Sequence, residues 1–218
     1  MIVLAFDCAT GPTSVALWRD GTLAGRADDA RPQGQAESLV PLIGAVLQQA
    51  GIAPVAVDRI AVTLGPGSFT GVRIALAAAR GLALAINRPV FGLSSLEVMA
   101  AALLPADRPT LVAVDAKRGE VYAQLFGADG KAMAGPLALP LDGIGTHLPA
   151  GPLRLAGSGA TLVAERLARP DLTLVPDLLA PDAAVLAALV AEMSAVFGTP
   201  SPEPIYLRAP DAKLPASA

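Results

Sequence analysis

Histidine and cysteine, the residues most often used for metal and nucleophilic chemistry, are nearly missing from this chain. It contains one histidine, His147, and one cysteine, Cys8, among 218 residues. A disulfide within the chain and a metal site held by two histidines are therefore excluded. A Ser-His-Asp triad would have to use His147, and the Gly-x-Ser-x-Gly turn that presents such a serine does not occur in the sequence. We predict no metal site and no catalytic residue.

Charge is also scarce. Charged residues make up 16% of the chain, against about 25% in an average soluble domain. With three lysines, scattered arginines, a net charge of −3 and a pI near 5.1, the chain lacks the basic patch with which proteins bind nucleic acid by themselves. Hydrophobic residues make up 53%. A surface so poor in charge suggests that another subunit covers part of it.

Long apolar runs are missing as well. The most apolar stretch follows Val72 and is interrupted by Arg73 and Arg80, so it falls short of the roughly 18 residues of a membrane span. The first residues lack the positive segment and the longer apolar run of a signal peptide. The sequence predicts no membrane association and a cytoplasmic protein.

An internal repeat organises the chain. Residues 2–28 and residues 110–139 follow the same order of features. Each segment begins with an apolar run that ends in an aspartate, Asp7 or Asp115, and continues with a polar turn. A strand pattern comes next, then an Asp-Gly dipeptide, and then a third extended run. Two three-stranded antiparallel meanders are expected.

The two Asp-Gly dipeptides, Asp20-Gly21 and Asp129-Gly130, predict the hairpin turns of these meanders. Asp-Gly between alternating strands favours a type I′ turn, in which both central residues have positive φ.

Helical periodicity follows each meander. In the first half, the pattern predicts helices at 36–50, 70–86 and 95–104 and a strand at 58–64. In the second half, it predicts a strand at 153–157 and helices at 159–168 and 181–197, the last one capped by Asp182. The order βββαβα(α), then βββ(β)αα, predicts an α/β fold of two lobes with mixed sheets. The expected N-terminal lobe covers residues 1–104, and the C-terminal lobe covers 105–218 and ends in a Pro-rich tail.

The stretch TLGPGSFTG, residues 63–71, joins a strand to the most apolar helix. Pro66-Gly67 fits a tight turn in which proline presets φ and glycine supplies a positive φ, and Ser68 or Thr70 can cap the helix. The helix is apolar on nearly all sides, which is typical of a buried helix. Either it is a core helix of one lobe, or it also forms a subunit interface together with the helix at 36–50.

Four motifs resemble those of a known family. A duplicated βββαβα lobe with an acidic residue at the end of its first strand resembles the actin/Hsp70/sugar-kinase superfamily of ATP-binding folds. Within that superfamily, four segments are similar to motifs of the TsaB family, also called YeaZ. They are LAFDCATGPTSVAL (4–17), LGPGSFTGVRIALAAARGLA (64–83), AVDAKRGEVYAQLF (113–126) and PIYLRAPDA (204–212).

The resemblance implies a non-catalytic subunit of tRNA N6-threonylcarbamoyladenosine (t6A) synthesis, with no strong tRNA binding of its own. It implies pairing with a TsaD-like transferase, docking of a TsaE-like ATPase, and a homodimer when the chain is alone. TsaD-like transferases hold a metal through a His-x-x-x-His spacing on a helix, which a chain with one histidine cannot reproduce. The helices of the first lobe are the implied packing surface. The candidate interface residues are Leu39, Val40, Ile43, Val46, Leu47, Arg73, Leu76, Ala77, Arg80 and Leu84.

The resemblance also raises ATP or ADP as a ligand. In the superfamily, hairpin turns present N–H groups to phosphates, and strand-end aspartates hold Mg²⁺ through water. The candidate nucleotide-binding residues are Asp7, Thr10, Gly11, Asp115, Gly157 and Gly159. The same residue types suit strand-to-strand turns for backbone reasons alone, so an inherited but decayed cleft without cofactor is the favoured interpretation. A small ATP-dependent kinase of the superfamily, and a peptidase or chaperone-like module, are the alternatives to a scaffold subunit.

Overall fold

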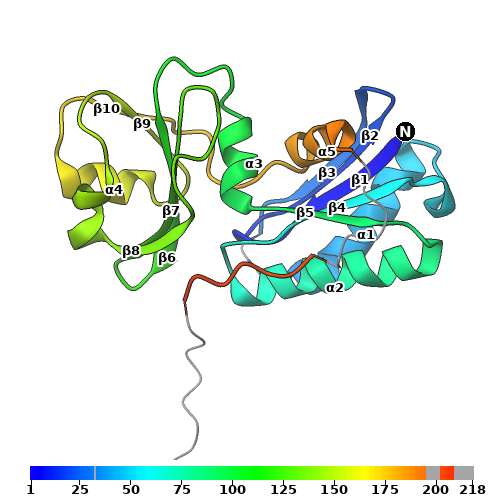
Figure 1. Ribbon diagram of the computed structural model, residues 1–218. Helices are drawn as coiled ribbons and strands as arrows, with labels where there is room; N and C mark the ends of the chain where they lie inside the picture. The colour runs from blue at the N-terminus through cyan, green and yellow to red at the C-terminus, as the bar shows by residue number, and fades with distance from the viewer. Residues whose placement is uncertain (32, 195–201, 209–218) are drawn as a thin grey trace, which may run out of the picture.

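The structure, a computed structural model, describes residues 1–31, 33–194 and 202–208 (Figure 1). It contains two five-stranded mixed sheets. The first has the spatial order β3 (Thr22–Asp29), β2 (Thr13–Arg19), β1 (Ile2–Asp7), β4 (Arg59–Thr63) and β5 (Val90–Leu93). The second has the order β8 (Leu137–Pro140), β7 (Glu120–Phe126), β6 (Thr110–Lys117), β9 (Leu153–Ala156) and β10 (Leu172–Leu174). The two orders are identical when each sheet is numbered from its own first strand, which confirms the internal repeat.

Each sheet combines an antiparallel meander with two parallel strands. Strands β1–β3 and β6–β8 form the two meanders, while β4 and β5 run parallel to β1, and β9 and β10 run parallel to β6. The helices are α1 (Gln35–Gln49), α2 (Phe69–Ile86), α3 (Ser95–Ala101), α4 (Ala160–Leu167) and α5 (Ala183–Glu192), with the 3₁₀ helices η1 (Pro54–Ala56) and η2 (Leu141–His147). All five helices of the described residues were predicted, although α3 ends three residues early. Helix α5 ends at Glu192, before the predicted end at 197, and residues 195–197 lie outside the described residues. The short strands β5 and β10 were not predicted.

The central strand β1 is buried on both of its faces. Leu4 and Phe6 point to the core under α1 and α2, whereas Val3 and Ala5 point to the core under α5. Successive side chains of a strand alternate between faces, so a strand covered on both sides reads as a continuous apolar run. This explains why the sequence at 2–6 shows no alternation.

The last helix of each half packs on the sheet of the other half. Helix α5 lies on the first sheet, where Leu186 and Val190 are fully buried against β1 and its neighbours. Helix α3 places Leu96 and Met99 on the second sheet, against residues of β6 and β7. The chain order had placed the helix at 181–197 in the second lobe, and this placement was wrong. The expected division near Leu104-Pro105 falls in the segment between α3 and β6.

The hairpin turns match the prediction in one lobe only. Asp20 and Gly21 both have positive φ, as a type I′ turn requires. In the second lobe the corresponding connection, between β7 and β8, contains Asp129-Gly130. The predicted type I′ turn at Asp129-Gly130 was wrong, because only Gly130 of that pair has positive φ.

Candidate functional site: the hairpin turns and the α1–α2 face

The β1–β2 turn begins with a buried carboxylate. Asp7 is 1% exposed, and its Oδ1 accepts hydrogen bonds from the Thr63 hydroxyl and, at 3.1 Å, from the Ala9 N–H. Burial raises the pKa of Asp7 to about 6, while the hydrogen bonds from Thr63 and Ala9 counteract part of that rise. Within the described residues, Asp7 Oδ2 and the Thr10 hydroxyl have no hydrogen-bond partner.

The start of α2 packs directly on this turn. The Ser68 N–H donates to the Ala9 carbonyl over 2.6 Å, and the Ser68 hydroxyl caps the helix by accepting from the Gly71 N–H at 3.2 Å. A Cβ atom at Gly67 would overlap the Ala9 carbonyl, and one at Gly71 would overlap the Cys8 carbonyl. The two glycines therefore allow the helix to touch the turn.

These contacts correct part of the sequence interpretation of 63–71. Of the two predicted capping residues, Ser68 and Thr70, it is Ser68 that caps the helix. The positive φ expected at Gly67 lies at Gly65 instead. Because Ser68 donates its N–H to a carbonyl of the same chain, the loop fastens α2 to the β1–β2 turn.

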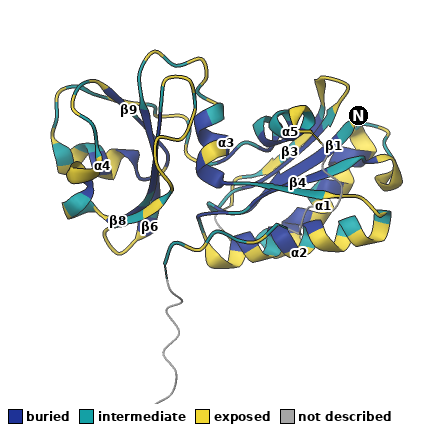
Figure 2. Cartoon of the chain, viewed as in Figure 1, coloured by how far each residue is buried: buried dark blue, intermediate teal, exposed yellow. Residues whose placement is uncertain are grey.

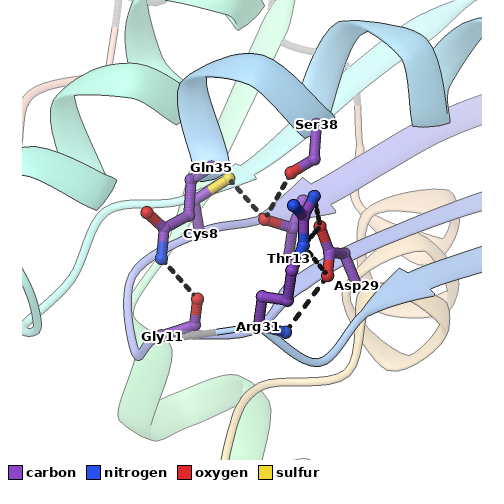
Figure 3. Close-up of polar contacts among 7 residues, drawn as sticks. All are labelled: Cys8, Gly11, Thr13, Asp29, Arg31, Gln35 and Ser38. Carbon is purple, nitrogen blue, oxygen red and sulfur yellow. Dashed lines mark hydrogen bonds and ion pairs between the residues drawn. The ribbon is translucent and has the colours of Figure 1, made fainter. Parts of the chain in front are cut away.

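A polar network fastens α1 to the same turn (Figure 3). Gln35 Nε2 donates to the carbonyl of Gly11 over 2.6 Å. The Thr13 hydroxyl lies 3.4 Å from that of Ser38, and the Cys8 thiol lies 3.9 Å from Thr13 Oγ1. The polar groups at this end of α1 thus bind the turn itself.

The Cys8 thiol is not activated. It is fully buried, and burial together with the neighbouring Asp7 raises its pKa to about 12. A thiolate is the nucleophilic form of cysteine, so Cys8 is a packing residue. The single histidine, His147, is exposed at the end of η2.

The equivalent turn of the second lobe is closed by an ion pair. Asp115 accepts from the backbone N–H of Lys117 at 2.8 Å and from its ammonium group at 2.7 Å. Partial burial alone would raise the pKa of Asp115, but these bonds hold it below its usual value. Gly157 and Gly159 serve packing: a Cβ at Gly157 would overlap the Ala113 carbonyl, which accepts the Gly159 N–H at 2.9 Å.

The six candidate nucleotide-binding residues divide between two turns of the chain. Asp7, Thr10 and Gly11 lie at the first turn, and Asp115, Gly157 and Gly159 lie at the second. Two cavities of the described part of the chain lie away from these turns, one beside Trp18 and one beside Arg108. No group of three metal-ligating side chains occurs in the described residues.

The candidate interface residues fall into two groups. One group is buried in the core of the first lobe: Leu39, Ile43, Val46, Leu47 and Leu76. These side chains pack against the sheet, so they are not available to a partner. A charge placed at Val46 would disrupt folding and would not test an interface.

The second group is exposed: Val40, Arg73, Ala77, Arg80 and Leu84. Leu84 is 86% exposed and Val40 is 64% exposed. Two of these residues are engaged by the C-terminal segment, since Arg73 Nε donates to the Tyr206 hydroxyl at 2.9 Å and Arg80 donates to the Pro202 carbonyl at 2.9 Å.

Helix α2 is apolar, yet most of it is uncovered. Of its eighteen residues, five are buried, and Figure 2 shows exposed residues along the side of α2 that points away from the sheet. By length and composition it is the one helix in the described ranges that could cross a membrane, but it carries two arginines and packs against β4 and α1. Its exposed residues Ala77, Gly81 and Leu84 share one side, because positions i, i+4 and i+7 of a helix do so.

Helix α1, which packs beside α2, also has the exposed residues Val40, Pro41 and Gly44. The α1–α2 face is defined by these three residues and by Ala77, Gly81 and Leu84 of α2. A Cβ atom at Gly44 or at Gly81 would meet nothing within 4 Å. The chain itself therefore does not require glycine at either position, while small residues let another helix approach closely.

Comparison with known proteins identifies the relatives of this chain. Residues 33–158 match the family model described as "TsaD: tRNA N6-adenosine threonylcarbamoyltransferase". The tRNA threonylcarbamoyladenosine biosynthesis protein TsaB of Escherichia coli is 40% identical over 124 residues, which are 56% of this chain and 53% of that protein. The chain thus matches about half the length of this curated relative.

Solved structures support the same assignment. YeaZ from Pseudomonas aeruginosa is 32% identical, with a TM-score of 0.77 over 87% of this chain and 90% of that one. Component A of (R)-2-hydroxyglutaryl-CoA dehydratase from Acidaminococcus fermentans is 11% identical, with a TM-score of 0.52 over 88% of this chain and 100% of that one. The second likeness shows the fold alone. The two-lobed actin/Hsp70/sugar-kinase-like fold predicted from the repeat is confirmed.

Proposed function

The chain belongs to the TsaB (YeaZ) family, and from this premise we propose that it is a non-catalytic subunit of t6A biosynthesis that binds a TsaD-like transferase. The α1–α2 face is the proposed contact surface. A TsaE-like ATPase docks on the resulting pair. In the absence of the transferase, the same face joins two copies of the chain.

The observation that carries this proposal is the exposed apolar side of α2. Burying a leucine such as Leu84 contributes about 1.5–3 kcal/mol, and that gain is unused while the residue is 86% exposed. Glycine inside a helix costs up to about 1 kcal/mol relative to alanine, so Gly44 and Gly81 are unfavourable for the isolated helices. A partner helix that approaches closely accounts for both features.

The chemistry of the described residues supports a role in binding. Cys8 is buried with a raised pKa, and the polar groups of both hairpin turns are largely engaged by Thr63, Gln35, Lys117 and backbone carbonyls. The proposed contribution to t6A synthesis is therefore contact with the transferase and not a reaction step.

The proposal predicts that Leu84→Glu abolishes the complex with a TsaD-like transferase and leaves the chain folded. A charge at this position would be buried without a partner, which is strongly unfavourable. The measurement is complex mass by light scattering on the mixed proteins, with circular dichroism to confirm folding.

The matched control is Leu179→Glu, because Leu179 is also exposed, at 57%, but precedes α5 outside the α1–α2 face. This control should bind normally. Co-elution of the Leu84→Glu variant with the transferase, at the mass of the wild-type complex, would show that the face is assigned wrongly.

A further inference from the structure

The segment 202–208 contacts both lobes, although most of the chain separates into one lobe or the other. In Figure 1 it is the red segment that runs from beside α2 toward the bottom of β6, while the chain from β10 to α5 passes on the upper side. It contacts the first lobe through backbone hydrogen bonds and aromatic and cationic side chains, and the second lobe through an arginine.

At the first lobe, the segment is held by hydrogen bonds of its own backbone. The Ile205 N–H donates to the Leu64 carbonyl at 2.8 Å, and Arg80 holds the Pro202 carbonyl. A Cβ atom at Gly92 would approach Pro202 Cβ to 2.7 Å, and one at Gly65 would approach the Ile205 carbonyl oxygen to 3.3 Å. Two glycines of the first lobe therefore make room for this segment.

The middle of the segment is held by aromatic and cationic contacts. The Tyr206 hydroxyl accepts from Arg73 Nε, and the Tyr206 ring lies 5.5 Å from the Phe69 ring. The Arg73 guanidinium lies 3.4 Å from the centroid of Phe69. Cation–π pairs of this kind are attractive even at exposed positions.

The second-lobe end is held by one arginine. Arg208 Nη1 donates to the Ala116 carbonyl at 3.2 Å and lies 3.2 Å from Glu120 Oε2. Ala116 belongs to β6 and Glu120 to β7, so Arg208 contacts both strands of the β6–β7 hairpin. Its ion pair with Glu120 is about one-third exposed on each side.

We propose that residues 202–208 are a strap that holds the two lobes in one relative orientation. The chain passes from the first sheet to the second between β5 and β6, through α3, and returns between β10 and α5, and these two crossings define a hinge. A third attachment away from the hinge restrains rotation about it. The strap is anchored at Leu64 and α2 in one lobe and at the β6–β7 hairpin in the other, so releasing either anchor weakens the other.

The test is Arg208→Ala, which removes the contacts with Ala116 and Glu120 and substitutes none of the residues that make the Leu64, Arg73 and Arg80 contacts. Amide hydrogen exchange is read at Ile205, whose N–H is bonded in the first lobe. If the strap links the lobes, exchange there rises roughly threefold, as expected for loss of a partly exposed ion pair with a hydrogen bond. Glu120→Ala, which alters the hairpin side of the same pair, should have the same effect.

The second readout is the distance between the lobes. Spin labels are placed at Val55→Cys in the first lobe and Leu162→Cys in the second, both exposed positions; the native Cys8 is fully buried and stays unlabelled. Arg208→Ala should broaden the distance distribution. Arg166→Ala is the matched control, because Arg166 makes an exposed ion pair with Asp142 inside the second lobe, and it should change neither readout.

The strap is rejected if Arg208→Ala leaves both the Ile205 exchange rate and the distance distribution at wild-type values. It is also rejected if Arg166→Ala changes both readouts as much as Arg208→Ala does. The measurements use the chain alone, so they are independent of whether the α1–α2 face binds a transferase.

Discussion

At the scale of residues, two aspartates at equivalent positions have pKa values shifted in opposite directions. Asp7 and Asp115 each stand near the end of the first strand of their lobe. Asp7 is buried beside Thr63 without a cation, and its pKa rises to about 6. Asp115 pairs with Lys117, and its pKa falls. The repeated sequence position therefore does not give a repeated electrostatic environment, because the neighbours of the two carboxylates differ.

The first prediction concerns the pH dependence of stability. The folded-state pKa of Asp7, about 6, lies above its usual 3.8, so folding favours the protonated form. The stability associated with Asp7 is full below about pH 4 and is lost as the pH rises to about 6. At about 1.4 kcal/mol per pH unit, the loss is roughly 3 kcal/mol.

Asp7→Asn cannot ionise, so its unfolding free energy should not show this decline. The measurement is denaturant unfolding of the variant and the wild type between pH 4 and pH 7. In Thr63→Val, the bond that lowers the Asp7 pKa is removed, so the decline should extend to higher pH. Parallel pH profiles for the wild type and Asp7→Asn would contradict the assignment.

At the scale of elements, α2 performs two tasks on opposite sides. Its inner side packs on β4 and on the β1–β2 turn, where Gly71 touches the Cys8 carbonyl. Its outer side belongs to the α1–α2 face, where a Cβ atom at Gly81 would meet nothing within 4 Å. Only Gly71 is therefore required by packing within the chain, and Gly81 is not.

The corresponding prediction is that alanine has opposite effects at these two glycines. Gly71→Ala should destabilise the chain by about 1–3 kcal/mol, because the added methyl group overpacks the turn. Gly81→Ala should stabilise it by up to about 1 kcal/mol, through helix propensity alone. Chemical denaturation of both variants measures this. A loss of stability in Gly81→Ala comparable to that in Gly71→Ala would show that the outer side is already occupied within the chain.

At the scale of the whole molecule, two lobes of one topology are joined by exchanged helices. Helix α3 covers the second sheet and α5 covers the first. The strap joins the lobes on another side. The arrangement keeps the actin/Hsp70/sugar-kinase-like fold, while the polar groups of its two turns largely bond to the chain itself.

We therefore predict that the purified chain binds no ATP–Mg²⁺ and hydrolyses none. The carboxylate of the candidate residue Asp115 is already paired with the Lys117 ammonium group, so a Mg²⁺ ion held there would have to compete with Lys117. Isothermal titration and a phosphate-release assay measure both properties, with a sugar kinase of the same superfamily as the positive control. Saturable binding with turnover would instead favour the kinase alternative.

What the sequence determined by itself is local. The apolar periodicity located α1 and α2, the Asp20-Gly21 pair predicted a type I′ turn, and the duplicated order of features predicted two sheets of one topology. These signals are carried by residues close together in the chain, since they depend on backbone propensity and on which face of an element is apolar.

Only the tertiary structure decided which apolar side chains face inward and which helix covers which sheet. The sequence shows Leu76 and Leu84 as similar residues of one apolar helix, yet one is 3% and the other 86% exposed. It could not place α5 on the first sheet or bring Arg208 to Glu120, because such contacts join residues far apart in the chain. Their pairing depends on the packing of the complete fold, which no local pattern encodes.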